Sequence, residues 1–410
     1  METEVFVHVD LLERTYLVGR IWTRSRSGKQ SSSFEYDADW LSNPKAFSLE
    51  PALTLGPGPF HTTEGKTLFG ALGDSAPDRW GRTLMRLAER YDSEKEKRTI
   101  RTLNEIDYLL RVDDVARQGA LRFSTKKDGP FLSDSSKKKI PPLIALPKLL
   151  SAANNIYSDK DSIDDLKLLL APGSSLGGAR PKVSIYDKDG SLAIAKFPHG
   201  SDEYRAVIWE AIALSLARKA KINVTEWRLE RVANNPVLLL KRFDRVGNSR
   251  LPFLSAMSML NAKDNEQRSY LEIADALRQF GSSAKADMQE LWRRIVFSIM
   301  ISNTDDHLRN HGFLYNDETG WKLSPAYDLN PIPLDIKPRI LSTTIGLEDG
   351  IASLDIALNV APYFEISRNT AEHIVKEVKG AVKTWRKVAS DFGLKKIEIE
   401  RMKSAFEYND

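Results

Sequence analysis

The segment 303–329, NTDDHLRNHGFLYNDETGWKLSPAYDL, carries the pattern from which the fold of this chain is best predicted. It follows the apolar run IVFSIMI at 295–301, which is typical of the end of a buried helix. GFLY and WKLSP flank the turn residues NDETG, so we expect a β-hairpin after this helix. Asp305 and Asn310 precede the hairpin, and Asp328 follows it. The prediction depends on this order of helix, Asp-x-x-x-x-Asn, hairpin and Asp.

The spacing of Asp305 and Asn310 is that of a kinase catalytic loop. In such a loop the Asp accepts the proton of the substrate hydroxyl, and the Asn binds magnesium. Asp328 is placed to hold the Mg²⁺ that bridges the nucleotide phosphates. Each residue alone has an ordinary interpretation, because Asp often caps a helix and Asn often occupies a turn. As an ordered set they predict Asp305 as general base, with Asn310 and Asp328 as metal ligands.

His307 and His311 support a second interpretation, a hydrolase site for zinc or manganese. Asp305 and Asp306 would supply its oxygen ligands. The common zinc helix motif also requires a Glu directly after its first His, and this Glu is absent here. The hydrolase site therefore remains the alternative.

A glycine-rich segment upstream, APGSSLGGARPK at 171–182, is a candidate phosphate cradle. Glycines let backbone N–H groups approach phosphate oxygens closely. No Gly-Lys-Ser/Thr follows them, so the segment is not a Walker A loop. A flexible connector has the same composition. The position of the segment favours the cradle, because it leads into a predicted hairpin whose second strand carries Lys196.

Lys196 is the only lysine in the apolar strand LAIAKFP, and Glu210 lies on the next predicted helix among apolar residues. We expect the two to form the ion pair of a kinase small lobe. The same sequence pattern would arise from a lysine that reaches solvent at the end of a strand and from an ordinary helix glutamate. The segment LLLKRFDR at 238–245 falls where a kinase joins its lobes. The backbone atoms expected to contact adenine are those of Lys241, Arg242 and Phe243.

The organisation of the chain predicts an α+β fold. Its 410 residues suit two or three packed domains. Residues 1–124 read as short strands followed by helices, an accessory domain in which Val5, Val7 and Val9 alternate as in a strand. Residues 143–243 read as a mixed, kinase-like small lobe, and residues 244–410 as a mainly helical large lobe. A helix is expected in GDSAPDRWGR, with Ser75 as its cap, Pro77 in its first turn and Asp78 near its positive end.

Composition excludes several classes of protein. Sixty Lys plus Arg against 56 Asp plus Glu give a net charge of +4, too weak to indicate direct nucleic-acid binding. There is no cysteine, which excludes disulfides and thiolate metal sites and favours a cytoplasmic setting. The acidic N-terminus does not resemble an export signal, and the apolar runs are too short to span a membrane.

These motifs together resemble the HipA-like toxin kinases, the toxin components of bacterial toxin-antitoxin pairs. The resemblance rests on segments that occur in the order found in that family: SSLGGARPK, AIAKFP, WEAIALSLA, LLLKRFDR, NTDDHLRN and LSPAYDL. GDSAPDRWGR resembles the start of a helix in the accessory domain of the family.

The resemblance implies an ATP- and Mg²⁺-dependent serine/threonine protein kinase that phosphorylates a host protein, for which aminoacyl-tRNA synthetases are known targets in the family. A small helix-turn-helix antitoxin, HipB-like, would be its partner and would provide the only link to DNA. Ser175 would be the autophosphorylated loop residue, with the adjacent Ser174 as second choice, and a phosphate there would compete with ATP. The residues that the resemblance places at the nucleotide are Gly177, Gly178, Ala179, Arg180, Pro181, Lys182, Lys196, His307, Asn310, Tyr327 and Asp328.

The sequence departs from the family at Asp306, which stands where some members carry Gly. Its carboxylate would add a negative charge beside the base. Two other functions remain open. Asp-x-His-x-x-Asn at 305–310 also resembles the loop of phosphoinositide kinases, so a lipid or small-molecule substrate is the enzymatic alternative. The non-enzymatic alternative is a transcriptional corepressor or scaffold with a degenerate nucleotide site.

Overall fold

The computed structural model of the chain describes residues 2–26, 29–133, 140–170, 178, 180–200, 202–316, 320–347 and 350–408. It is a mixed structure of helices and strands, as expected. Contacts divide it into two compact units, the first made of Met1–Ser201 and Glu230–Leu254 and the second of Asp202–Leu229 and Ser255–Asp410. The three domains with boundaries near 124, 143 and 243 stay a prediction. No helix in the described part of the chain is long and apolar enough to cross a membrane.

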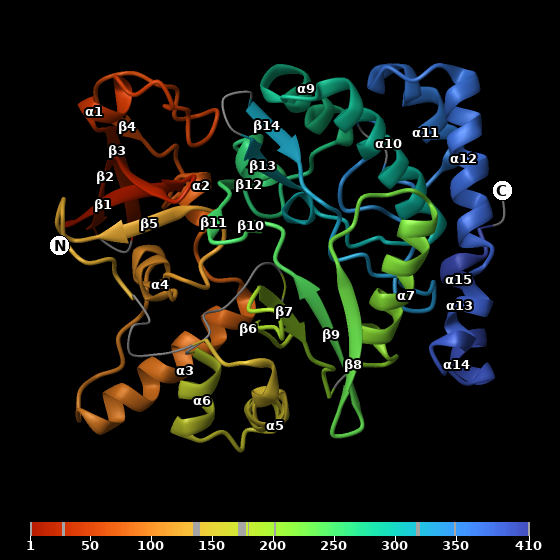
Figure 1. Ribbon diagram of the computed structural model, residues 1–410, viewed down its shortest axis with the longest axis horizontal. Helices are drawn as coiled ribbons and strands as arrows, with labels where there is room; N and C mark the ends of the chain where they lie inside the picture. Colours follow the sequence, from red (N-terminus) through yellow and green to blue (C-terminus); the bar gives the residue numbers. More distant parts are fainter. Residues whose placement is uncertain are drawn as a thin grey trace. The chain divides into compact units, whose positions relative to one another are not determined.

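The first unit begins with a five-stranded sheet in the order β4-β3-β2-β1-β5 (Figure 1). Its strands are β1 (Glu2–Leu11), β2 (Arg14–Arg26), β3 (Lys29–Tyr36), β4 (Phe60–His61) and β5 (Leu121–Ser124). Val5, Val7 and Val9 are all fully buried, which confirms their predicted alternation in a strand. Leu12 and Glu13 both have positive φ, as in the two-residue turns that match the twist of antiparallel strands.

A second sheet of this unit has the order β6-β7-β9-β8 and carries the predicted hairpin. Its strands are β6 (Lys182–Tyr186), β7 (Leu192–Lys196), β8 (Trp227–Val232) and β9 (Asn235–Lys241). β6 and β7 are antiparallel, and the turn between them ends at Gly190 with φ +79°, in the left-handed region that favours glycine. The helices that share a core with this sheet are α3 (Arg79–Lys95), α5 (Leu146–Tyr157) and α6 (Ile163–Leu170).

Helix α3 connects the N-terminal segment to the second sheet. Trp80 and Leu84 on α3 pack in the same hydrophobic core as Ile185 of β6 and Phe197 after β7. The cap of α3 is Asp78, whose side chain accepts the Gly81 N–H. The expected cap, Ser75, is instead the C-cap that follows the short helix α2 (Gly70–Asp74), because the chain makes a turn before α3 begins.

The remaining elements of this unit are α1 (Ala38–Leu41), α4 (Glu105–Arg111), η2 (Leu143–Ala145), β10 (Arg245–Val246) and β11 (Ser249–Arg250), and β12 (Phe253–Ser255) ends at the unit boundary.

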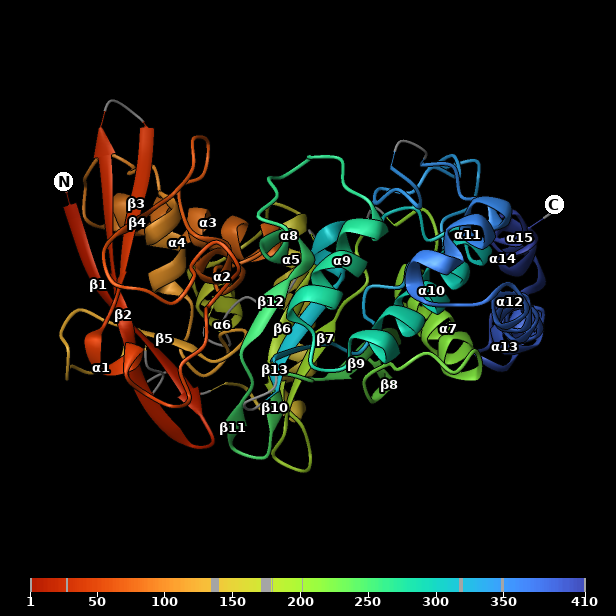
Figure 2. The ribbon, with the colours of Figure 1, turned by 90° about the horizontal axis from the view of Figure 1, so that it is seen from above.

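The second unit is mostly helical and is organised around α10 (Ala284–Met300). The C-terminal half of α10 is buried on all sides, and α9 (Tyr270–Phe280) and α12 (Arg368–Val382) pack beside it, as Figures 1 and 2 show. A helix buried all round is expected from the apolar run at 295–301, which is interrupted only by Ser298. The hairpin predicted after it is present as β13 (Gly312–Asn316) and β14 (Gly320–Leu323). The other helices are α7 (Ala206–Lys219), α8 (Ala256–Met259), η3 (Leu308–Asn310), α11 (Leu354–Val360), η4 (Ala361–Phe364), α13 (Trp385–Asp391), α14 (Lys396–Arg401) and α15 (Lys403–Phe406).

Candidate active site

The loop that follows α10 is fixed by a buried asparagine. The Asn303 side chain donates to Ser298 Oγ at 3.3 Å, and its Oδ1 accepts the Asn330 N–H at 3.1 Å. Asn330 in turn donates to the Asp328 carbonyl oxygen at 3.1 Å. Since Asn303 lies two residues before Asp305, these bonds tie the segment of the predicted base to the segment of the predicted magnesium ligand.

Asp305 lies at the surface of the second unit, with 58% of its side chain exposed. Its backbone carbonyl accepts the His307 N–H at 2.9 Å and the Asn310 Nδ2–H at 3.0 Å. The five-residue spacing thus closes a tight loop, with the Asn310 amide folded back onto the Asp305 backbone. Lys337 Nζ lies 3.6 Å from Asp305 Oδ1. An exposed carboxylate on a fixed backbone can accept a proton from an incoming hydroxyl.

The oxygen of the Asn310 amide indicates where a metal would bind. Asn310 is buried, and its Oδ1 has no hydrogen-bond partner among the described residues, although a buried polar oxygen is normally satisfied. Asp328 adopts the left-handed conformation, with φ +54°, which is uncommon outside glycine and frequent at functional sites. An amide oxygen and a carboxylate are hard oxygen ligands that fit Mg²⁺.

Asp306 differs from the adjacent Asp305 in being buried and bound to other side chains. Its carboxylate is buried, accepting the Tyr270 hydroxyl at 2.5 Å and Ser298 Oγ–H at 3.1 Å, and it lies 3.1 Å from His311 Nε2. Burial raises the pKa of Asp306, but the opposing charge of His311 and these hydrogen bonds outweigh burial and lower it. The described residues contain no cluster of three or more His, Asp or Glu side chains that could hold a metal ion.

Two further predicted residues belong to this loop. The Tyr327 hydroxyl donates to the Arg309 carbonyl at 2.7 Å, which is a second bond between the segment of the predicted base and the Asp328 segment. His307 is half-buried, and its Nδ1 has no hydrogen-bond partner in the part of the chain that the structure describes. Glu210 is buried in α7 of the second unit, whereas Lys196 belongs to the first, so their ion pair stays a prediction.

In the first unit the structure brings together two of the predicted phosphate contacts. Lys182 and Lys196 are directly opposite each other in the β6–β7 register, and both are buried. Side chains directly opposite in an antiparallel pair lie on the same face of the sheet. Gly178 is described, with φ +95°, and a Cβ on it would lie 3.4 Å from Lys182 Nζ. The structure also describes Arg180 and Pro181, and the residues of this segment that lie outside the described part are Ser174, Ser175, Gly177 and Ala179.

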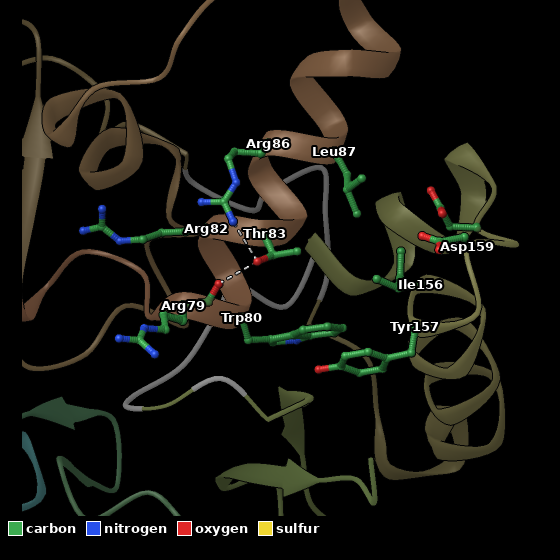
Figure 3. Close-up of a pocket in the computed structure, with 10 residues that line it drawn as sticks. Arg79, Trp80, Arg82, Thr83, Arg86, Leu87, Ile156, Tyr157 and Asp159 are labelled. Carbon is green, nitrogen blue, oxygen red and sulfur yellow. Dashed lines mark hydrogen bonds between the residues drawn. The ribbon is translucent and has the colours of Figure 1, made fainter. Parts of the chain in front are cut away.

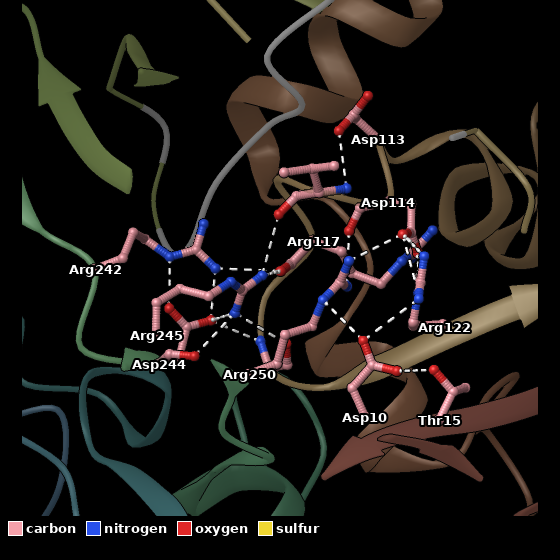
Figure 4. A network of polar contacts seen from close by, with 12 residues as sticks. Asp10, Thr15, Asp113, Asp114, Arg117, Arg122, Arg242, Asp244, Arg245 and Arg250 are labelled. Carbon is pink, nitrogen blue, oxygen red and sulfur yellow. Dashed lines mark hydrogen bonds and ion pairs between the residues drawn. The ribbon is translucent and has the colours of Figure 1, made fainter. Parts of the chain in front are cut away.

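The predicted adenine-contact segment is held by a buried polar network (Figure 4). Lys241 ends β9, and the Arg242 N–H donates to the Leu192 carbonyl at 3.0 Å, so this donor is already used within the sheet. Phe243 packs against Phe253, with ring centroids 6.2 Å apart. The Arg242 guanidinium is buried and forms a bidentate ion pair with Asp244. Sequence reasoning missed Asp244, for which the only signal was an acid directly after a predicted strand.

A cavity of about 430 Å³ opens in the first unit between α3 and the end of α5 (Figure 3). Trp80 and Tyr157 line it as a stacked pair with centroids 5.2 Å apart. Arg79, Arg82 and Arg86 from α3 also line it, but Arg82 is already bound to Glu105 through two hydrogen bonds. None of the predicted site residues lines this cavity.

Comparisons with known proteins identify relatives of both halves of the chain. The family model of the HipA-like C-terminal domain matches residues 174–385, and that of the HipA N-terminal domain matches residues 11–107. A putative kinase of Haemophilus influenzae is 35% identical over 101 residues, 23% of this chain and 29% of that protein. The putative kinases Y4dM and Y4mE of Sinorhizobium fredii are 29% identical over 184 residues and 24% identical over 371 residues.

The extent of these matches differs. The match to Y4dM spans 38% of this chain and 44% of that protein, so the first two relatives are matched over less than two thirds of their length. The match to Y4mE spans 83% of this chain and 81% of that protein. Among solved structures, HipA of Shewanella oneidensis MR-1, in a complex of HipA, HipB and operator DNA, superimposes with a TM-score of 0.66. That comparison covers 98% of this chain and 95% of the other at 15% identity, and it confirms the α+β, kinase-like fold.

Proposed function

The chain belongs to the HipA-like family, and from that membership and the geometry around Asp305 we propose that it is an ATP- and magnesium-dependent serine/threonine protein kinase. The observation that carries the proposal is the closed loop in which the Asn310 amide holds the Asp305 backbone while its own oxygen is left for a metal. Relatives named as putative kinases support the same class of reaction.

The residues of the chain then have distinct tasks. The nucleotide and Mg²⁺ supply the transferable phosphoryl group and the positive charge that balances it. Asp305 accepts the proton of the substrate hydroxyl as that oxygen forms its bond to the γ-phosphorus and the bond to the β-phosphate oxygen breaks. Asn310 and Asp328 would hold the Mg²⁺ through oxygen atoms. Lys182 and Lys196 place two ammonium groups on one face of the sheet for the phosphates.

The test is transfer of labelled γ-phosphate from Mg·ATP to proteins of a host lysate, comparing wild type with Asp305→Ala. Because Asp305 is largely exposed, its replacement has little effect on stability, so loss of transfer reports on chemistry. We expect labelled proteins with the wild type and none with the variant. Equal labelling by both would refute the role of Asp305, and label found only in the lipid extract would favour the lipid-kinase alternative.

The proposal extends to partners and regulation. The HipA structure that shares this fold was solved with HipB and operator DNA. We expect this chain to bind a small helix-turn-helix antitoxin in the cytoplasm, with DNA contacted through that partner, and to act as a toxin on a host protein such as an aminoacyl-tRNA synthetase. Ser175 is the expected autophosphorylation site. Mass spectrometry after incubation with Mg·ATP should find phosphate on the peptide spanning 171–182, and its absence would contradict that site.

A further inference from the structure

One acidic residue of the N-terminal segment reaches the nucleotide-binding part of the first unit. Asp78 Oδ2 lies 3.0 Å from Lys182 Nζ, and the side chains are only 4% and 3% exposed. Asp78 Oδ1 accepts the Gly81 N–H at 2.8 Å and so caps α3. The two oxygens of one carboxylate therefore serve different groups, the helix end and the lysine. A buried ion pair of this kind fixes both partners, because loss of either leaves an uncompensated buried charge.

The surroundings of Lys182 show why its position matters. Lys196 lies directly across the β6–β7 pair on the same face, so two buried lysine side chains leave the sheet from neighbouring positions. Like charges placed this way repel each other unless anions are close. Asp78 places a carboxylate beside Lys182, and the proposed function adds the negative charges of the ATP phosphates. The Lys182 ammonium also lies against Gly178, where an added Cβ would be 3.4 Å away.

We propose that Asp78 is a positioning residue for nucleotide binding, which holds the Lys182 ammonium beside Gly178 in the place where it meets a phosphate. This inference rests on the proposed kinase function. A lysine side chain is flexible, and fixing it before the nucleotide arrives reduces the entropy lost on binding. The arrangement of carboxylate, lysine and phosphate is the one by which kinases orient a phosphate-binding lysine. Here the carboxylate comes from Asp78, the N-cap of α3, so the N-terminal segment completes the nucleotide site.

The substitution Asp78→Asn separates the two tasks of the residue. Asparagine caps helices as well as aspartate does, so α3 keeps its cap, while the charge that fixes Lys182 is lost. The affinity of the purified full chain for a non-hydrolysable ATP analogue with Mg²⁺ is measured by calorimetry. We expect roughly tenfold weaker binding, in line with the loss of one charge-assisted contact. Unchanged affinity would overturn the positioning role.

A double-variant cycle shows whether Asp78 acts through Lys182. Lys182→Met should weaken binding, and adding Asp78→Asn to it should weaken binding no further. The double variant leaves neither member of the pair charged, so it stays testable even where Asp78→Asn alone fails to fold. An additional loss of affinity in the double variant would mean that Asp78 acts by another route, and would overturn the inference.

Two comparisons keep the inference separate from the proposed function. Asn104 is the N-cap of α4, and its side-chain oxygen accepts the Asp107 N–H. Asn104→Ser replaces this cap by another residue that caps helices well and should leave nucleotide affinity unchanged. If Asn104→Ser weakened binding as much as Asp78→Asn, the effect would be a general one of helix caps, and the positioning role would be wrong. A wild type that binds no nucleotide would overturn the kinase proposal and the inference with it.

Discussion

Lys337 Nζ lies 3.6 Å from Asp305 Oδ1, and the same ammonium donates to the Thr304 carbonyl at 3.3 Å. The proposed base thus has a cation beside it that the sequence did not indicate. In phosphoryl transfer a positive charge near the base stabilises the charge on the transferring group. We predict that Lys337→Met lowers kcat by roughly tenfold or more, with a smaller change in KM for ATP. Steady-state transfer of labelled phosphate measures both constants.

The second unit offers a matched control for this substitution. Lys403, an exposed residue of α15, lies 3.6 Å from the carboxylate of Glu407, the same separation as in the Lys337–Asp305 pair. Lys403→Met removes an equivalent surface ion pair and should leave kcat unchanged. A Lys337→Met enzyme as fast as the Lys403→Met enzyme would show that the Lys337–Asp305 pair is an ordinary surface contact.

Asn310 is expected to control the dependence on magnesium. Its Oδ1 is buried without a partner among the described residues, while its Nδ2 holds the Asp305 carbonyl. Asn310→Ala should therefore raise the Mg²⁺ concentration that gives half-maximal transfer by roughly tenfold, and Asn310→Asp, which keeps an oxygen ligand, should raise it less. Titration of Mg²⁺ at fixed ATP measures this. Identical titration curves for Asn310→Ala and wild type would exclude the amide from the metal site.

The local parts of this site were predictable and the long-range parts were not. The hairpin between Gly312 and Leu323 depends on residues close in sequence, so its turn residues and flanking apolar segments indicated it. Lys337 reaches Asp305 from 32 positions away, in a segment without periodicity or motif. Such contacts are set by the packing of the whole unit, which one sequence does not display.

The burial of Asp306 is a second property of the site that the sequence did not indicate. Its neighbour Asp305 is exposed, and the pattern gives no sign that consecutive carboxylates lie in opposite environments. The partners that neutralise Asp306 are Tyr270 on α9 and Ser298 on α10, which follow from helix packing and not from the loop itself.

Glu89 on α3 predicts a specific dependence of stability on pH. Its side chain is 2% exposed; burial raises its pKa, but the hydrogen bonds from Arg98 and Arg111 outweigh burial and lower it from 4.5 to about 2. A lowered folded-state pKa gives stability that is present above the unfolded value and is lost as the pH falls toward the folded value. Glu89→Gln should lower the free energy of unfolding by about 3 kcal/mol at pH 7.

The difference between wild type and Glu89→Gln should then shrink between about pH 4.5 and about pH 2, because the wild-type carboxylate becomes protonated there. Urea unfolding at several pH values, followed by tryptophan fluorescence, measures it. A stability difference that stays constant down to pH 2 would mean that the ion pairs of Glu89 do not account for its contribution.

Asp244 is expected to be the most sensitive residue of the buried network in Figure 4. Its carboxylate is fully buried and accepts hydrogen bonds from the Arg242 and Arg245 guanidiniums and from the Gly119 N–H at 2.8 Å. The two arginines lower its pKa despite burial, so it is charged in the folded chain. Asp244→Asn leaves two buried cations without their anion and should lower the free energy of unfolding by about 3 to 5 kcal/mol.

Arg242 also donates to the carbonyl oxygens of Ala116 and Arg117. The network therefore connects the segment after α4 to the segment after β9. Removing the Arg242 cation as well, in Asp244→Asn with Arg242→Met, should therefore recover part of the lost stability, since fewer buried charges remain unpaired. Chemical denaturation of the single and double variants measures the recovery. If the double variant were less stable than the single one by the full cost of Arg242→Met alone, the two residues would contribute independently, and charge balance would not be what holds these segments together.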